Sequence, residues 1–103
     1  MLDRAISKWG RDAQIHMAIE EMAELIQALM KYPRKQDGST LNKVIEEIVD
    51  VEIMLEQLKL MFITNTGLGI EYAEIKEEKL KRLEKLLPEN TAEKKREEEL
   101  NDG

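Results

Sequence analysis

The sequence of 103 residues contains no cysteine, one histidine and two prolines. The absence of cysteine excludes a disulfide framework and a zinc–thiolate site and fits a reducing compartment, so we expect a cytoplasmic protein. Long apolar runs are also missing, because the longest is Leu60–Ile63, and charged residues interrupt the N-terminal segment. We therefore expect no transmembrane helix, no secretory signal and no membrane partner.

Positive charge is in short supply. Sixteen Lys and Arg against 22 Asp and Glu give a net charge of −6 and a sequence pI near 4.9. This balance has the wrong sign for a chain that coats a nucleic acid polymer or anionic lipid. The length is that of one domain, so we expect one core and no second catalytic module.

The remaining composition favours an all-α fold, because strong helix formers fill the segments between the few Gly and Pro residues. The predicted helices are Leu2–Trp9, Arg11–Lys31, a helix N-capped by Ser39 or Thr40 that runs to about Ile63, and Ile70–Leu87, which Pro88 stops. The turn Tyr32–Gly38 folds the first two long helices into an antiparallel hairpin. We expect residues 1–88 to form the domain and residues 89–103 a polar, disordered or frayed tail without a catalytic role.

The second long helix is unusually apolar, with 11 apolar residues among the 16 from Ile48 to Ile63. One face of a peripheral helix does not need so many. A hairpin and one further helix cannot cover such a segment in a chain of this size. We therefore expect a homo-oligomer, at least a dimer, that completes a four-helix-bundle-like core.

Acidic residues occur at matched positions on the two helices of the hairpin. Glu21 and Glu24 precede the turn, and Glu47 and Asp50 follow it, each pair at i and i+3 and therefore on one helix face. In an antiparallel hairpin, residues whose numbers have the same sum lie at the same height. The sum is 71 both for Glu21 and Asp50 and for Glu24 and Glu47, and half of this sum falls inside the predicted turn. The hairpin thus places all four acids at one level.

Two interpretations of these acids remain open. Carboxylates about 5.5 Å apart repel by roughly 3 kcal/mol at an effective dielectric near 20, so a partly buried cluster takes up protons or a hard cation. Oxygen ligands without Cys or His favour Mg²⁺ or Mn²⁺. Alternatively, the acids are solvent-facing residues of an acid-rich chain, since Glu71, Glu74 and Glu77 repeat the same spacing.

The acidic pattern E-E-x-x-E, a spacer of 22 residues and E-x-x-D resembles the MazG-like branch of the all-α nucleoside triphosphate pyrophosphohydrolases. The resemblance covers about Trp9 to Leu87 and includes Lys8-Trp9-Gly10, Gln14, the run from Ala18 to Leu25, and Lys79-Leu80-Lys81-Arg82-Leu83. It implies Mg²⁺-dependent cleavage of a nucleoside triphosphate between the α and β phosphates, which releases the monophosphate and pyrophosphate. It also implies a dimer or tetramer of helical bundles.

The resemblance assigns roles to individual residues. Glu21, Glu24, Glu47 and Asp50 become the metal ligands, and Glu20, the extra acid of the motif, orients the attacking water or is simply an exposed helix residue. Lys79 and Arg82 clamp the β and γ phosphates or pair with neighbouring acids such as Glu78.

The resemblance also suggests a binding site for the base. Trp9 stacks on the base, with Gln14 reading its edge, or packs into the core. Two further function classes stay open beside the hydrolase: a noncatalytic helical interaction protein and a metal-binding bundle without activity.

Overall fold

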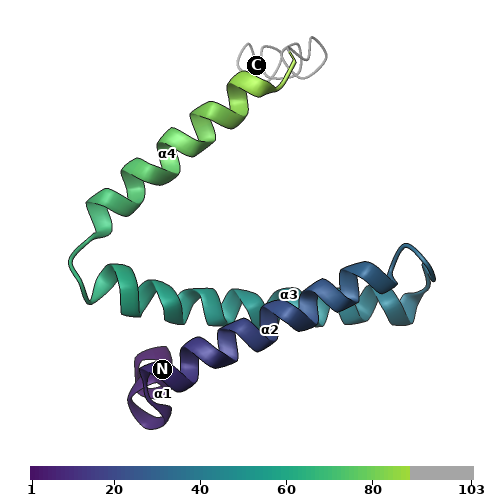
Figure 1. The fold of residues 1–103 in the computed structure, drawn as a ribbon, viewed down its shortest axis with the longest axis horizontal. Helices are drawn as coiled ribbons and strands as arrows, with labels where there is room; N and C mark the ends of the chain where they lie inside the picture. Colours follow the sequence, from purple (N-terminus) through teal and green to yellow (C-terminus); the bar gives the residue numbers. More distant parts are fainter. Residues whose placement is uncertain (89–103) are drawn as a thin grey trace, which may run out of the picture. The chain divides into compact units, whose positions relative to one another are not determined.

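The computed structural model describes residues 1–88, and these residues form an all-α structure (Figure 1). The helices are α1 (Leu2–Trp9), α2 (Arg11–Lys31), α3 (Gly38–Lys59), the π-helix η1 (Leu60–Thr64) and α4 (Gly69–Leu86). No strand occurs within residues 1–88. The predicted fold class is confirmed, and the predicted helix bounds agree closely. The predicted tail 89–103 lies outside the described residues.

Gly10 separates α1 from α2. Its φ of +90° lies in a region that L side chains rarely adopt, which explains why the chain breaks between two helices at a glycine. The Gly10 N–H donates to the Ile6 carbonyl at 2.8 Å and closes α1. The next residue, Arg11, begins α2, and α1 packs against both α2 and α3.

Asp37 caps the N-terminus of α3, so the prediction of Ser39 or Thr40 as N-cap is wrong. The Asp37 carboxylate accepts from the Thr40 N–H at 2.9 Å, and the Thr40 hydroxyl accepts from the Asp37 N–H at 3.1 Å. This reciprocal pair is a capping box, in which Thr40 is the third helical residue rather than the cap. The cap fixes where α3 begins and hence its register against α2.

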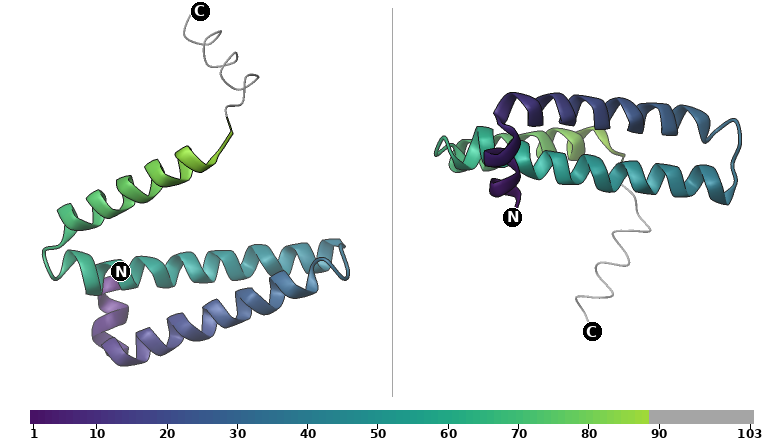
Figure 2. Two further views of the ribbon diagram at one scale, coloured as in Figure 1. Left: turned by 45° about the horizontal axis from the view of Figure 1, so that its top comes forward. Right: turned by 90° about the horizontal axis from the view of Figure 1, so that it is seen from below.

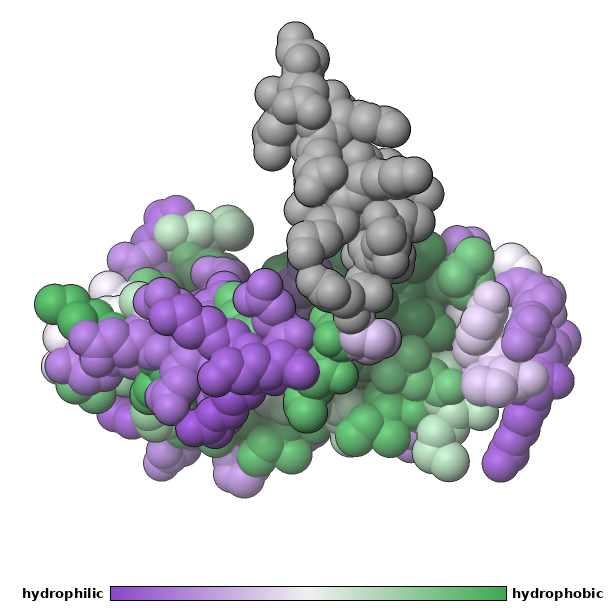
Figure 3. Space-filling view, turned by 90° about the horizontal axis from the view of Figure 1, so that it is seen from above, coloured by the Kyte–Doolittle hydropathy of each residue, from purple (hydrophilic) through white to green (hydrophobic). Residues whose placement is uncertain are grey.

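Helices α2 and α3 pack side by side as an antiparallel hairpin (Figure 2). Their contact line buries few apolar side chains: Ala18, Ala28, Val44 and Met54, together with Met61 of η1. Many apolar side chains of the hairpin instead remain exposed in the chain: Ile19, Ile26, Leu29 and Met30 on α2 and Ile45, Ile48, Val49 and Ile53 on α3. Figure 3 shows hydrophobic residues at the molecular surface beside hydrophilic ones.

The second long helix ends in a wider turn than the sequence predicts. The Asn65 N–H donates to the Leu60 carbonyl at 2.9 Å, and the Leu68 N–H donates to the Ile63 carbonyl at 2.9 Å. Both bonds span five residues, the π-helical pattern. The Thr66 hydroxyl donates to the Phe62 carbonyl at 2.7 Å and helps to end the helix.

The chain divides into two compact units, Met1–Gly69 and a second unit that begins at Ile70 and contains α4 from its second residue onward. Within the second unit, Tyr72, Ile75, Leu80 and Leu83 line one groove along α4. Among residues 1–88, no helix combines the length and apolar character that crossing a membrane requires.

Candidate functional site

Three of the four predicted acids meet at the contact between α2 and α3. Glu21 of α2 and Glu47 and Asp50 of α3 each offer a carboxylate oxygen, and these oxygens lie within 4.8 Å of one another. Glu24, the fourth predicted acid, is exposed on α2. Its carboxylate still interacts with those of Glu21 and Glu47, so Glu24 lies at the rim of the cluster.

Glu47 is the most deeply buried large side chain of the described residues, only 2% exposed. It follows Val44 by three residues and precedes Met54 by seven, so it shares their inward face of α3. The apolar sequence neighbours of Glu24 and Asp50 favour at least partial burial of both; Asp50 is half-buried, whereas Glu24 is exposed. Burial is decided by the helix face, not by the adjacent residues.

Two carboxylate oxygens of the cluster are buried and have no hydrogen-bond partner: Oε2 of Glu21 and Oε2 of Glu47. The other oxygen of Glu47, Oε1, accepts an ion pair from Lys43 Nζ at 2.8 Å. Buried polar atoms without a partner are rare in folded proteins, because each loses its hydrogen bonds to water. The two orphaned oxygens are therefore the feature of the cluster that requires an explanation.

The electrostatics of Glu21 and Glu47 differ. Burial, followed by the negative charges of Glu24, Asp50 and Glu47, raises the pKa of Glu21 above its ordinary value. The hydrogen bond from Lys43 lowers the pKa of Glu47 and outweighs its burial. The Lys43 ammonium thus favours the ionised form of Glu47. Burial and the neighbouring negative charges disfavour the ionised form of Glu21.

The residues present fit a hard divalent cation. All donors are carboxylate oxygens, which suit Mg²⁺ and Mn²⁺ better than Zn²⁺. A cation held by Glu21, Glu47 and Asp50 would give partners to the two orphaned oxygens and offset the repulsion among the acids. Within residues 1–88 this is the group of His, Asp and Glu side chains whose ligand atoms approach closely enough for shared coordination.

A groove near the start of α2 lies beside the predicted base-binding residues. Trp9, Ala13, Gln14 and Met17 line it, and its volume is about 300 Å³. Trp9 is 58% exposed, so it is not a core residue of this chain, and the Lys8 ammonium lies 5.1 Å from its ring. The structure thus brings Trp9 and Gln14 together on one groove.

Gln14 is buried and held by Gln57, a residue that is not among those predicted from the sequence. Its Nε2 donates to Gln57 Oε1 at 2.6 Å, and Gln57 Nε2 donates to Met54 Sδ at 3.7 Å. The sequence contains a signal for this pair. The residue numbers of Gln14 and Gln57 add up to 71, as do those of Glu21 and Asp50, so the antiparallel hairpin places Gln14 opposite Gln57. The amide of Gln14 is therefore fixed in orientation beside the groove.

The other predicted residues make contacts of their own or none that bear on the cluster's two orphaned oxygens. Glu20 is exposed on α2. Lys79 and Arg82 lie on α4 within the second unit, where Arg82 pairs with Glu78 at 2.9 Å, the surface pairing that the helix spacing offers.

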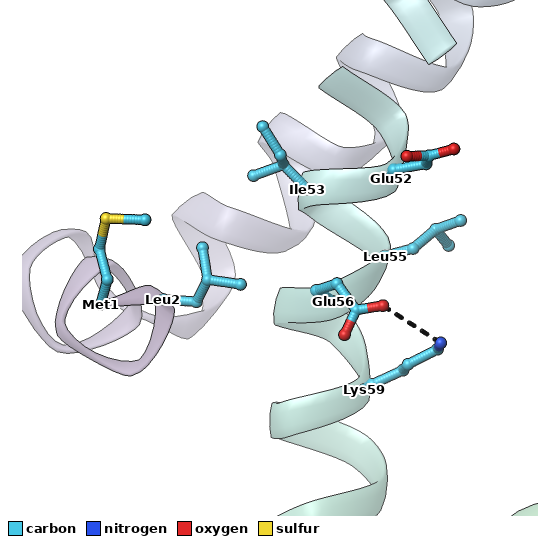
Figure 4. Close-up of a pocket in the computed structure, with 7 residues that line it drawn as sticks. All are labelled: Met1, Leu2, Glu52, Ile53, Leu55, Glu56 and Lys59. Atoms are coloured by element: carbon cyan, nitrogen blue, oxygen red, sulfur yellow. Dashed lines mark hydrogen bonds and ion pairs between the residues drawn. The ribbon is translucent and has the colours of Figure 1, made fainter. Parts of the chain in front are cut away.

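A further pocket of about 440 Å³ is lined by residues of α1 and α3 and by Met1. One ion pair among its lining residues joins Glu56 to Lys59 at 3.3 Å (Figure 4).

Comparisons with protein-family models, with curated proteins and with solved structures give no match for this chain. What the chain can do chemically therefore follows from the arrangement of its own side chains. That arrangement is a partly buried oxygen cluster that can hold a cation, and a groove with one aromatic ring and one fixed amide farther along α2. Together they form a candidate cation site and an apolar groove that carries an aromatic ring.

Proposed function

We propose that this chain is a Mg²⁺-dependent nucleotide pyrophosphohydrolase of the MazG-like kind, in which Mn²⁺ can replace Mg²⁺. It cleaves a ribo- or deoxyribonucleoside triphosphate between the α and β phosphates into the monophosphate and pyrophosphate. The observation that carries the proposal is the pair of buried carboxylate oxygens without partners, Glu21 Oε2 and Glu47 Oε2, inside an acid cluster shared by two helices.

Each acid has a separate part in the proposed site. Glu21, Glu47 and Asp50 hold the cation, and Glu24 completes the set from the rim. A bound divalent cation supplies charge neutralisation on the phosphates and an activated water. Glu20, exposed on the same helix, orients that water.

The groove at the start of α2 receives the nucleobase. Gln14 precedes Glu21 by seven residues, so the two lie two turns apart along α2, about 10 Å at 1.5 Å per residue. That separation is comparable with the distance from a base edge to the α phosphate of a nucleotide. Trp9 stacks on the base, and the fixed Gln14 amide pairs with its edge.

Lys79 and Arg82 are proposed to bind the β and γ phosphates. They lie at i and i+3 on α4, and such neighbouring cations on one helix face suit a polyphosphate. Arg82 exchanges its present partner, Glu78, for a phosphate in this role. The surface pair costs little to break, because exposed ion pairs contribute little stability.

The proposed active form is a cytoplasmic homo-oligomer, a dimer or a tetramer. The support is the amount of apolar surface that the chain leaves uncovered on α2 and α3, including Ile26 at 58%, Ile45 at 50% and Val49 at 47%. Large apolar side chains left exposed on two adjacent helices favour association. A second copy offers the same helices and completes a bundle.

The direct test incubates the full chain with mixed nucleoside triphosphates and Mg²⁺ and identifies the products. The proposal predicts pyrophosphate and monophosphate, lost in Glu47→Gln and retained in Glu46→Gln, which changes an exposed neighbour on the same helix. Orthophosphate as the sole product contradicts the proposed reaction. A well-folded protein that forms no product favours a noncatalytic interaction protein or a metal-binding bundle, which the uncovered apolar faces and the acid cluster respectively support.

A further inference from the structure

The two carboxylate oxygens of Glu47 have different environments. Oε1 accepts the ion pair from Lys43 Nζ at 2.8 Å, whereas Oε2 is buried and without a hydrogen-bond partner. Oε2 therefore remains available to a ligand of the acid cluster while Oε1 is engaged. Lys43 precedes Glu47 by one helical turn, and Asp50 follows Glu47 by almost one turn. The Lys43 ammonium and the Asp50 carboxylate therefore flank Glu47 along α3.

We propose that Lys43 is the positioning residue of the metal site. It holds Glu47 through Oε1 in the orientation that presents Oε2 to the same cation as Glu21 Oε2. The inference rests on the proposed metal site and goes beyond it, because Lys43 has no place among the residues of the acidic motif. Groups that orient a metal ligand by hydrogen bonding commonly matter almost as much to metal affinity as the ligands themselves.

A comparison within the chain distinguishes this ion pair from an ordinary surface pair. Lys81 and Glu77 on α4 have the same i,i+4 spacing, but both side chains are 68% exposed and their atoms lie 3.2 Å apart. The Lys43–Glu47 pair is shorter and joins a 59% exposed lysine to a 2% exposed carboxylate. Lys43 thus extends from the surface to Oε1 of a carboxylate that is shielded from solvent.

The opposite role for Lys43 is that of a competing cation. In that case the lysine occupies the place of the metal, and its removal tightens metal binding. The positions of the unpartnered oxygens oppose this role, because the orphaned atom is Oε2, whereas the lysine engages Oε1. The two roles predict changes of opposite sign in metal affinity.

The experiment measures Mn²⁺ binding by isothermal titration calorimetry at one fixed pH, with the full chain and without nucleotide. Lys43→Met removes the charge and the donor at similar length, Lys43→Arg retains both, and Lys81→Met is the matched control. We expect Lys43→Met to weaken Mn²⁺ binding about 10- to 100-fold. Lys43→Arg should restore most of the affinity, and Lys81→Met should leave it unchanged.

Several results would overturn the inference. Equal or tighter Mn²⁺ binding by Lys43→Met contradicts a positioning role, and so does failure of Lys43→Arg to restore affinity. If the wild-type chain binds no Mn²⁺, the proposed metal site fails and the role of Lys43 fails with it. Metal binding with no effect of Lys43→Met leaves the metal site intact and removes only this inference. If Lys43→Met does not fold by circular dichroism, Lys43→Gln provides the same comparison.

Discussion

The buried Gln14 side chain on α2 donates to Gln57 on α3 across a distance of 2.6 Å. This bond shares its register with the acid cluster, because the residue numbers of Gln14 and Gln57 have the same sum, 71, as those of Glu21 and Asp50. In an antiparallel hairpin, one register fixes all pairs at once. The amide pair therefore supports the same alignment of α2 and α3 that brings the acids together.

Loss of one amide should destabilise the hairpin. Gln57→Leu leaves the buried Gln14 N–H without its acceptor, and an unsatisfied buried donor costs about 1–3 kcal/mol. Urea denaturation at fixed protein concentration measures the change. Gln27→Leu, at an exposed position of α2, is the control. The double variant Gln14→Leu/Gln57→Leu should lose less than the sum of the single changes, because it leaves no orphaned group. Additive losses would contradict coupling between the two amides.

Divalent cations should stabilise the folded chain. The proposed Mg²⁺ or Mn²⁺ site forms in the native chain and not in the unfolded chain, so the melting temperature should rise with metal concentration. Differential scanning fluorimetry should show a reduced rise in Glu47→Gln and in Asp50→Asn, and a smaller reduction in Glu24→Gln, since Glu24 lies at the rim. Glu46→Gln is the control. An unchanged metal response in the cluster variants would argue against this ligand set.

The metal-free chain should respond to pH through Glu21. Its pKa lies above the ordinary value of 4.5, so the native state holds the proton more tightly than the unfolded state. Stability contributed by this group is therefore present at low pH and is lost as pH rises through the raised pKa. Glu47, whose pKa is lowered, behaves oppositely: its contribution is present above 4.5 and is lost as pH falls through the lowered value.

Glu21→Gln should accordingly stabilise the metal-free protein near pH 7 and change its stability little near pH 4, where Glu21 in the wild type is largely protonated. Urea midpoints at the two pH values measure the effect. Added Mg²⁺ should reverse the advantage, since the variant lacks one ligand. A destabilised Glu21→Gln at neutral pH without metal would show that the repulsion among these acids is not significant.

The fold followed from the sequence where local signals are strong. Gly10 and Pro88 mark helix ends, and the apolar spacing from Ile15 to Leu29 marks a long helix. The N-cap was assigned wrongly because Asp37, Ser39 and Thr40 are all good capping residues, and only the reciprocal hydrogen bonds select Asp37. The π-helical end of the second long helix, Leu60–Thr64, has no comparable sequence signal.

The sequence predicted the alignment of the acids across the hairpin, but not which of the acids is buried. The matched spacing of Glu21, Glu47 and Asp50 predicted their approach across the hairpin. Which acid is buried depends on small rotations of each helix, so the sequence could not select Glu47 over Glu24. The part of Lys43 arises from contact with a buried carboxylate and has no sequence signal, whereas the register that aligns Glu21 with Asp50 also aligns Gln14 with Gln57 and indicates that pair.

Trp9 should report on the groove. It is the one tryptophan of the chain and is 58% exposed, so the emission of the metal-free protein should be red-shifted and readily quenched by acrylamide. A nucleoside monophosphate with Mg²⁺ should shift the emission and reduce quenching as a base covers the ring. Gln14→Leu should weaken this response, whereas Gln27→Leu should not. Nucleotide binding that leaves Trp9 fully quenchable would place the base elsewhere.

The uncovered apolar faces of α2 and α3 should join copies of the chain. Ile45 and Val49, one turn apart on α3, are about half exposed, at 50% and 47%. Light scattering at micromolar concentration should give a dimer or tetramer mass. Ile45→Glu/Val49→Glu should shift the mass toward the monomer and lower the melting temperature, because burying a charge in an apolar contact is costly. Glu46→Gln, between them in sequence, is the control. A monomer mass for the wild type would mean that a different partner, or water alone, meets this face.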